Sequence, residues 1–180
     1  NPLAERLHMA IHFEAVPTQI GQHLLVRLTE QASRALPSRV MVMAEGTMNG
    51  VSFTAPLEPD GQGGHWLGIS DTLAREGRAE IGQAVSITLT PINDWPEPEM
   101  PRDIMDALEH ENLLPQWHSL TTKARWAWLR WIRATANPAT RNKRIAVAVD
   151  KLRRGDRRPC CFNAGMCTVP EVSKGGILID

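Results

Sequence analysis

Cationic and aromatic side chains gather in one short stretch of this sequence, and they are the residues best suited to binding chemistry. Residues 121–158 carry twelve Lys and Arg against two acidic residues, a net charge of +10, with three tryptophans among them. Guanidinium and ammonium groups bind phosphates and carboxylates, and indole rings stack on bases. The candidates for binding an anion or partner are Arg125, Arg133, Arg141, Lys143 and Arg144, and those for stacking are Trp126, Trp128 and Trp131.

Three of these cations lie where a helix disfavours them. Arg141, Lys143 and Arg144 fall in the first two turns of a helix expected to begin at Asn137-Pro138. The positive end of the helix dipole costs each cation a few tenths of a kcal/mol there, about 0.3. They are expected either to pair with carboxylates of the acidic barrel or to bind an external anion such as phosphate. Simple solvation is the third interpretation.

Charge is segregated along the whole chain, although the total is zero. Residues 1–120 carry seven Arg against sixteen Asp and Glu, a net charge of −9. We therefore expect the cationic helices to lie against an acidic body, which would neutralise them within one fold. A second run of cations lies at the end of the last helix, where the helix dipole favours positive charge. These cations are either ordinary helix-end charge or a patch that binds nucleic acid. That run is Lys151, Arg153, Arg154, Arg157 and Arg158.

The tryptophans have two interpretations. Trp128, Trp131 and Ile132 follow the i, i+3, i+4 spacing of a buried stripe, whereas Trp126 lies off that line. Packing in the core or between modules is favoured, because aromatic burial dominates core energetics. Stacking on bases or on another planar ligand is the alternative.

The cysteines give a weak metal signal. Cys160, Cys161 and Cys167 follow a C-C-x5-C pattern, whereas zinc sites usually combine two pairs of ligands at C-x2–4-C spacing. Ordinary reduced thiols are favoured over metal binding, with a redox or crosslinking role as a further alternative. An odd number of cysteines makes a poor disulfide framework, so a cytoplasmic location is expected. No cofactor is expected.

Catalytic motifs are missing from the sequence. There is no Gly-x-Ser-x-Gly, no P-loop, and no pair of histidines on one helix face that would bind a metal. No run approaches eighteen apolar residues, so no membrane span is expected. An enzyme is therefore not favoured, and a site in the mouth of a barrel, which no linear motif reveals, is the remaining route to catalysis.

Short strands separated by turns dominate the first part of the chain. The strongest local signal is Asn49-Gly50, which supplies the two positive-φ positions of a type I′ hairpin turn. The expected strands are 11–16, 24–28, 40–43, 51–57, 65–69 and 85–89, with a short helix at 71–78 that Asp71 would cap. Strands at this spacing favour a small barrel over residues 8–94.

Helices are expected after the proline-rich linker Trp95–Glu99. They cover 102–111, 121–135 and 138–154, with Pro115 as a breaker after the first and Gly155 ending the last. The last two form an αα-hairpin within a module of residues 95–155 that packs back on the barrel. Residues 156–180 are expected to be an irregular tail that contains the cysteines. The fold class is thus mainly β with C-terminal helices, an α+β arrangement.

Two segments resemble known bacterial families. The hairpin Gly46–Phe53, followed by Gly61–Leu67 and Gly82–Val85, resembles a double-split β-barrel domain of unknown function. The segments Leu120–Arg125 and Asn137–Ile145 resemble the bacteriocin-protection, OmpD-associated helical module. Gln83 stands where the first family commonly has Asp. The resemblance implies the fold, and its label describes a phenotype without implying a reaction.

These observations favour a non-catalytic binding or interaction protein of unassigned role, with stress or bacteriocin protection as the role that the family label suggests. The partner is not identified by the sequence, and a protein is one candidate. The alternative is nucleic-acid or phosphorylated-ligand binding through the basic helical hairpin, which is not favoured. The second alternative is an uncharacterised enzyme.

Overall fold

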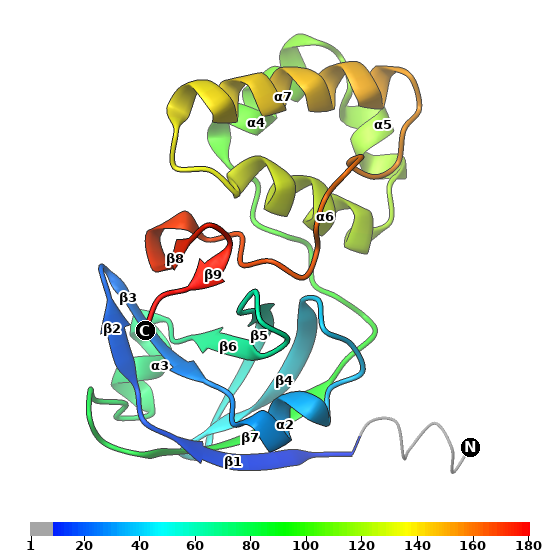
Figure 1. Cartoon of the computed structure of the whole chain (residues 1–180). Coiled ribbons are helices and arrows are strands. Elements are labelled where there is room, and N and C mark those ends of the chain that lie inside the picture. Colours follow the sequence, from blue (N-terminus) through cyan, green and yellow to red (C-terminus); the bar gives the residue numbers. More distant parts are fainter. Residues whose placement is uncertain (1–8) are drawn as a thin grey trace. The chain divides into compact units, whose positions relative to one another are not determined.

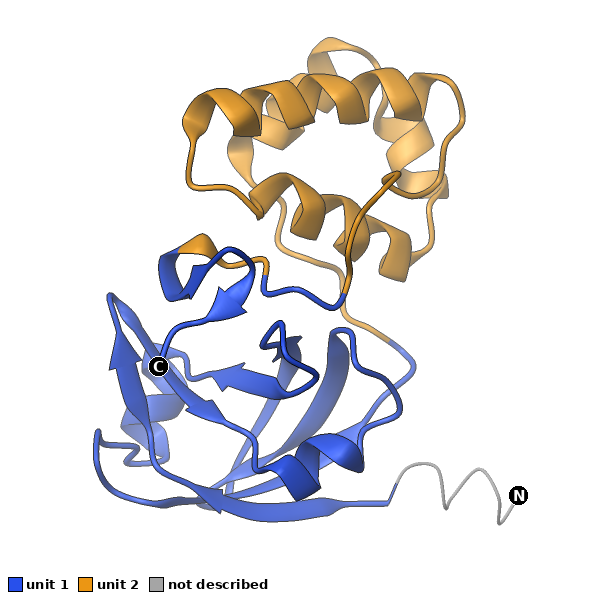
Figure 2. Ribbon diagram, in the orientation of Figure 1, with its two compact units in different colours: residues 1–94, 165–167, 171–180 blue, residues 95–164, 168–170 orange. Residues whose placement is uncertain are grey.

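The computed structural model describes residues 9–180, and the predicted start of the barrel at residue 8 lies outside them. The chain forms two compact units, which Figure 2 colours separately. We call residues 1–94, 165–167 and 171–180 the sheet unit, and residues 95–164 and 168–170 the helical unit. The packing of one on the other stays a prediction.

The sheet unit is built on one antiparallel sheet of seven strands that curls into a half-barrel (Figure 1). Its spatial order is β1-β7-β4-β5-β6-β3-β2. The predicted fold class, mainly β with C-terminal helices, is confirmed. The strands are β1 (Ile11–Ala15), β2 (Thr18–Ile20), β3 (His23–Arg27), β4 (Val42–Met48), β5 (Val51–Pro59), β6 (His65–Gly68) and β7 (Val85–Pro91).

The hairpin between β4 and β5 forms at the predicted turn. Asn49 and Gly50 have φ values of 49° and 84°, as a type I′ turn requires. The Asn49 side chain also ties the turn to its surroundings: its amide donates to the Gly77 carbonyl at 2.7 Å, and its Oδ1 accepts from the Ser86 amide at 2.9 Å. Gly46 is required nearby, because a Cβ there would lie 1.8 Å from the Thr88 carbonyl oxygen on β7.

Two short helices accompany the sheet, α2 (Glu30–Arg34) and α3 (Asp71–Glu76). The cap of α3 is Ser70, whose hydroxyl accepts from the Leu73 amide at 3.1 Å, so the prediction of Asp71 as cap is wrong by one residue. The core is formed by alternate strand residues such as Val26, Leu57 and Leu89, all fully buried.

Part of the segment expected to be an irregular tail, residues 156–180, forms strands in the sheet unit. A 3₁₀ turn (Pro170–Val172) leads into a hairpin of β8 (Ser173–Lys174) and β9 (Ile177–Leu178). Leu178 is buried and its amide donates to the Asp60 carbonyl at 2.9 Å. Arg27 donates to the Ile179 carbonyl at 2.8 Å. These long-range contacts have no local signal in the sequence.

The helical unit contains four helices around its own core (Figure 1). Pro115 opens a helix of its own instead of only ending the previous one. Thr121 caps the first of the two long helices and Asn137 the second, and Gly155, with φ 89°, follows the last. The helices are α4 (Arg102–His110), α5 (Leu114–Ser119), α6 (Thr122–Arg133) and α7 (Pro138–Arg153).

Candidate functional site

Two of the three cations at the start of α7, Arg141 and Arg144, are bound by groups of the helical unit itself. Arg141 makes a two-pronged pair with Asp103 on α4, with Nε–Oδ2 and Nη2–Oδ1 distances of 2.7 and 2.9 Å. The Arg141 guanidinium lowers the pKa of Asp103 mainly through this hydrogen bonding. The prediction that Arg141 pairs with a carboxylate of the barrel is therefore wrong, because Asp103 belongs to the helical unit.

Arg144 and Arg133 are also held within this unit. Arg144 donates to the Trp131 carbonyl at 2.9 Å and lies over the Trp131 ring at 5.6 Å, a cation–π contact. Arg133 donates to the Thr168 hydroxyl at 3.1 Å. Lys143 is exposed and makes no ion pair within residues 9–180. Of the three cations at the start of α7, Lys143 is thus the one that is exposed without an ion pair among the described residues.

Arg125 lies near the opposite end of α6 from Arg133. Eight residues separate the two along the helix, about 12 Å at 1.5 Å per residue. Arg125 pairs with Glu97 at 2.8 Å and donates to the Leu120 carbonyl at 2.5 Å. The five residues predicted to bind an anion therefore do not form one patch.

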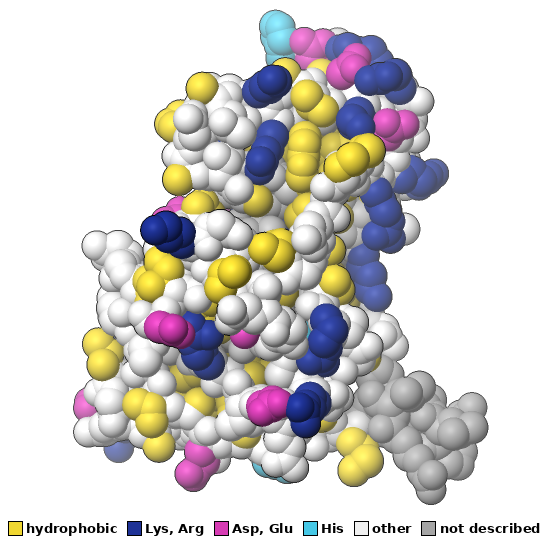
Figure 3. Space-filling model, in the orientation of Figure 1, with side chains coloured by type: hydrophobic (Ala, Val, Ile, Leu, Met, Phe, Trp, Pro, Cys, Tyr) yellow, Lys and Arg dark blue, Asp and Glu magenta, His cyan; other side chains and the backbone are white. Residues whose placement is uncertain are grey.

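The exposed cations gather instead where α7 ends. Arg153 pairs with Glu111, and Arg154 pairs with Asp150 one turn earlier. Arg157 donates only to the Ser119 carbonyl, at 3.3 Å, and neither Arg157 nor Arg158 has a carboxylate partner among the described residues. Figure 3 shows Lys and Arg side chains gathered along one side of the helical unit. We call Arg153, Arg154, Arg157 and Arg158 the cationic end.

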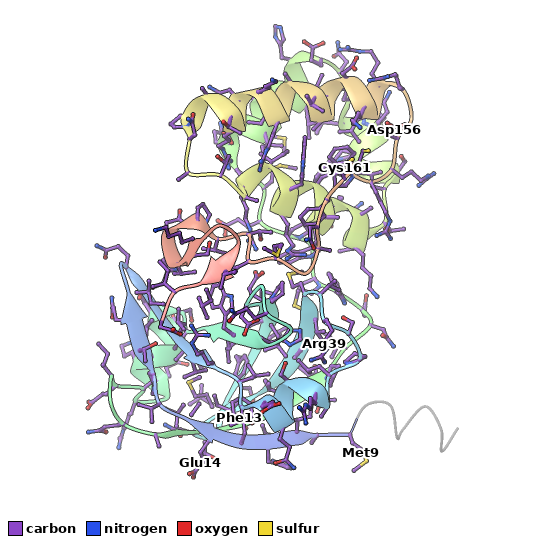
Figure 4. The ribbon with its side chains drawn as sticks, viewed as in Figure 1. Met9, Phe13, Glu14, Arg39, Asp156 and Cys161 are labelled. Atoms are coloured by element: carbon purple, nitrogen blue, oxygen red, sulfur yellow. The ribbon has the colours of Figure 1, made fainter. Side chains whose placement is uncertain are left out.

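The Trp128 side chain is hydrogen-bonded to the backbone of the cationic end. The Trp128 side chain is fully buried, and its indole N–H donates to the Arg157 carbonyl at 3.0 Å. Gly155 turns the chain at this point, and the Asp156 amide donates to the Lys151 carbonyl at 3.0 Å. Figure 4 labels Asp156 at the end of α7. The position of the cationic end is thus set by a buried side chain and by helix-terminal hydrogen bonds.

The three predicted stacking residues are all engaged in packing. Trp128 belongs to the core and Trp131 meets its ring edge-on, with centroids 6.0 Å apart. Trp126 lies on another face, as its spacing predicted, and donates to the Pro96 carbonyl at 2.8 Å. Trp95 meets Trp126 edge-on at 6.3 Å. Trp128 is thus a core residue, as the packing interpretation predicted, whereas Trp126 and Trp131 are half-buried.

The three cysteines are divided between the two units. No group of three or more His, Cys, Asp or Glu side chains within residues 9–180 is arranged to bind a metal ion. All three thiols are free. Cys160 and Cys161 are exposed, whereas Cys167 is buried in the sheet unit.

The sheet unit contains a buried serine–histidine pair that was not predicted from the sequence. The Ser33 hydroxyl lies 2.6 Å from Nδ1 of His65, whose Nε2 lies 2.8 Å from the Val40 carbonyl. Because a carbonyl only accepts, Nε2 carries the proton and Nδ1 accepts from Ser33. Burial lowers the pKa of His65, and the nearby Arg39 adds to this effect. Both side chains are almost fully buried, so the pair is suited to joining α2 to β6 rather than to attacking a substrate.

An open groove of about 590 Å³ runs between β1 and α2. Its apolar wall includes Ile11, Phe13 and Ala32, and its polar groups include His12 and Glu14. Phe13 and Glu14 project to opposite sides of β1 in Figure 4, as neighbours on a strand do. The volume is in the range of small-molecule sites. His12 contacts Thr88 at 2.9 Å and has no carboxylate partner among the described residues, so the groove holds no pair for acid–base work.

Comparison with known families agrees with this architecture. Residues 13–89 match a domain of unknown function, DUF1905, and residues 97–155 match OmdA, described as "Bacteriocin-protection, YdeI or OmpD-Associated". The predicted recognition is confirmed. The DUF1905 match covers β1 to most of β7, and the OmdA match covers α4 to α7. None of the curated proteins compared with the chain matches it.

For Arg157 and Arg158 the sequence left ordinary helix-end charge and a nucleic-acid patch as alternatives. Both residues are exposed and lie just beyond the OmdA match. Their signal was present in the sequence: two adjacent arginines follow the helix-ending Gly155, where no turn of helix remains to supply an i−4 carboxylate. Ser33 and His65 are 32 residues apart and had no such signal.

Proposed function

We propose that this protein is a non-catalytic binding protein whose cationic end docks on an acidic protein surface. The observation that carries the proposal is that Arg157 and Arg158 are exposed and have no carboxylate partner within residues 9–180. Arginine is enriched at protein interfaces, where its planar fork binds carboxylates. The helical unit as a whole has thirteen Lys and Arg against eight Asp and Glu.

An acidic protein is favoured over a nucleic acid because of the aromatic residues. Proteins that bind single strands combine a basic groove with rings on which bases stack. Here Trp128 is buried and Trp126 is held by the linker, so the cations have no accompanying platform. Carboxylates on a protein partner can be bound by the guanidinium groups alone, without aromatic rings.

A protective role is the physiological context that we propose. The OmdA family is described by bacteriocin protection, and a protein that works by occupying a partner's surface requires no catalytic group. We place it in the cytoplasm, an assignment supported by three free thiols. No helix of the described residues is long and apolar enough to cross a membrane.

The test uses two anionic probes and the full chain. A fluorescent poly-glutamate peptide and a DNA duplex of similar total charge are titrated with protein at low salt, and anisotropy is followed. We expect the acidic peptide to bind and its affinity to fall as salt is raised, because screening weakens exposed ion pairs. The DNA duplex, which has a similar total charge, should bind no more tightly than the peptide.

Two matched charge reversals locate the surface. Arg158→Glu changes the cationic end, and Lys143→Glu makes a comparable change near the other end of α7, also at an exposed cation without an ion pair. We expect Arg158→Glu to weaken peptide binding about tenfold, or about 1.4 kcal/mol, and Lys143→Glu to leave it within twofold. Equal effects of both variants would contradict the proposed surface. Tight binding of DNA alone would overturn the proposed partner class.

The groove beside β1 supports a second candidate function, binding of a small ligand with both apolar and polar groups. Its volume and the half-buried Phe13 ring favour this. Binding of a hydrophobic fluorescent dye should be lost in Phe13→Ala and kept in Phe53→Ala, a half-buried phenylalanine on β5 that does not line this groove. Equal dye binding by both variants would exclude the groove as a site.

A further inference from the structure

Cys160 and Cys161 form a pair of contacting thiols in the segment that follows the cationic end. Their sulfur atoms lie 3.1 Å apart, and both residues are exposed. Cys161 has φ 60°, a left-handed conformation that residues other than glycine and asparagine seldom adopt. The backbone thus turns at the second cysteine, and this turn brings the two sulfurs into contact.

We propose that Cys160 and Cys161 are an oxidation site, which closes reversibly to a disulfide between adjacent residues. The sulfurs already lie within van der Waals contact, so closure needs an approach of about 1 Å to reach the S–S bond length. The Cα atoms of neighbouring residues are only about 3.8 Å apart. Unstrained disulfides usually span about 4.4–6.8 Å, so the closed ring is strained and readily reduced.

The two thiols interact before they react, because the hydrogen bond to Cys160 raises the pKa of Cys161. We assign Cys160 as the attacking sulfur and Cys161 as the resolving sulfur. The charge of Lys151 acts in the opposite direction on Cys161 and favours its later deprotonation. The thiolate is the attacking species in thiol–disulfide exchange.

The oxidant is a low-molecular-weight disulfide of the glutathione type. The Cys160 thiolate attacks one sulfur of this disulfide, forms a mixed disulfide and expels the first small thiolate, which takes up the proton that Cys160 lost. Cys161 then loses its proton and attacks the Cys160 sulfur, which expels the second small thiolate. Two protein thiols are oxidised, one disulfide is reduced, and two small thiols leave with the two protons.

The test counts thiols by mass spectrometry of the full chain. Oxidised glutathione is added, excess reagent is removed, and the protein is unfolded and alkylated. The sequence has three cysteines, so reduced protein takes three alkyl groups. We expect oxidised protein to remain monomeric, to take one alkyl group and to regain three after mild reduction. Retention of three groups, or a disulfide-linked dimer, would overturn the proposal.

Single substitutions separate the roles of the cysteines. Cys161→Ser should stop at the mixed disulfide and retain one glutathione, because the resolving sulfur is missing. Cys167→Ser should leave ring closure intact and give a protein with no free thiol after oxidation. A trivalent organoarsenical, which needs two neighbouring thiols, should bind wild type and not Cys161→Ser. Ring closure that depends on Cys167, or arsenical binding by Cys161→Ser, would contradict the assignment. Unchanged thermal melting of each variant shows that the fold is intact.

Discussion

The two units of this protein use polar and charged groups in opposite ways. In the sheet unit, the Ser33–His65 pair is buried, so its hydrogen bonds stabilise the fold and are costly to break. In the helical unit, several cations lie at the surface in exposed ion pairs, such as Arg154 with Asp150, and others, such as Arg158, are exposed without an ion pair among the described residues. Exposed pairs contribute little to stability. Charge in the helical unit is therefore available for binding, whereas the buried pair of the sheet unit serves the fold.

The largest expected loss of stability is in the core of the helical unit, where a buried side chain contributes far more than an exposed charge. Trp128→Ala should lower the free energy of unfolding by about 3–5 kcal/mol, because it removes a fully buried indole and leaves a cavity. The half-buried Trp126 is the matched control, and Trp126→Ala should cost clearly less. Chemical denaturation measures both, and equal losses would contradict the assignment of Trp128 as the core residue.

The buried pair of the sheet unit should give the next largest effect. Ser33→Ala leaves Nδ1 of His65 without its donor and should cost about 1–3 kcal/mol. The exposed Ser52 on β5 is the control position, and Ser52→Ala should change stability by less than about 0.5 kcal/mol.

The same pair predicts a pH dependence with a defined sign. Burial lowers the pKa of His65 in the folded protein, so below about pH 6.5, the ordinary value for histidine, the unfolded chain binds more protons than the folded chain. The contribution of His65 is therefore fully present above that pH and is lost as the pH falls toward the folded pKa. A His65→Gln variant should show a flatter stability curve between pH 7 and 5, and an unchanged slope would contradict the prediction.

The sequence predicted the local structure well because its signals are local. Asn49-Gly50, the Asn137 cap and Gly155 each specify a backbone conformation through their own chemistry, and all three are found in place. The residues that gave wrong predictions depend on distant partners. Arg141 was expected to meet a barrel carboxylate and meets Asp103, and residues 171–180 belong to the sheet unit, which they contact through Asp60 and Arg27. No periodicity encodes such pairings.

A smaller effect is expected for the exposed pair between Arg141 and Asp103. A double-mutant cycle with Arg141→Gln and Asp103→Asn should give a coupling of about 0.2–1 kcal/mol, because the Asp103 side chain is 43% exposed. Arg141 lowers the pKa of Asp103, so this contribution is present above the unfolded pKa of about 3.9 and disappears as the pH falls through the folded value. A coupling of zero at pH 7 would show that the pair only positions α4 and α7.

The smallest effect on stability is expected at the cationic end itself. Neutralising it in the double variant Arg157→Gln/Arg158→Gln should change the free energy of unfolding by less than about 0.5 kcal/mol, because both side chains are exposed and neither makes an ion pair within the described residues. A larger loss would mean that these arginines stabilise the fold, as the prediction of an acidic body beneath the helices requires.

The most direct test of the account is the salt dependence of binding to an acidic polypeptide, measured for wild type and for the same Arg157→Gln/Arg158→Gln variant. If the cationic end makes the contacts, the affinity of wild type falls steeply with salt, and the variant binds more weakly with a shallower dependence. Identical affinities and identical salt dependence would contradict the claim that these exposed arginines are the binding surface.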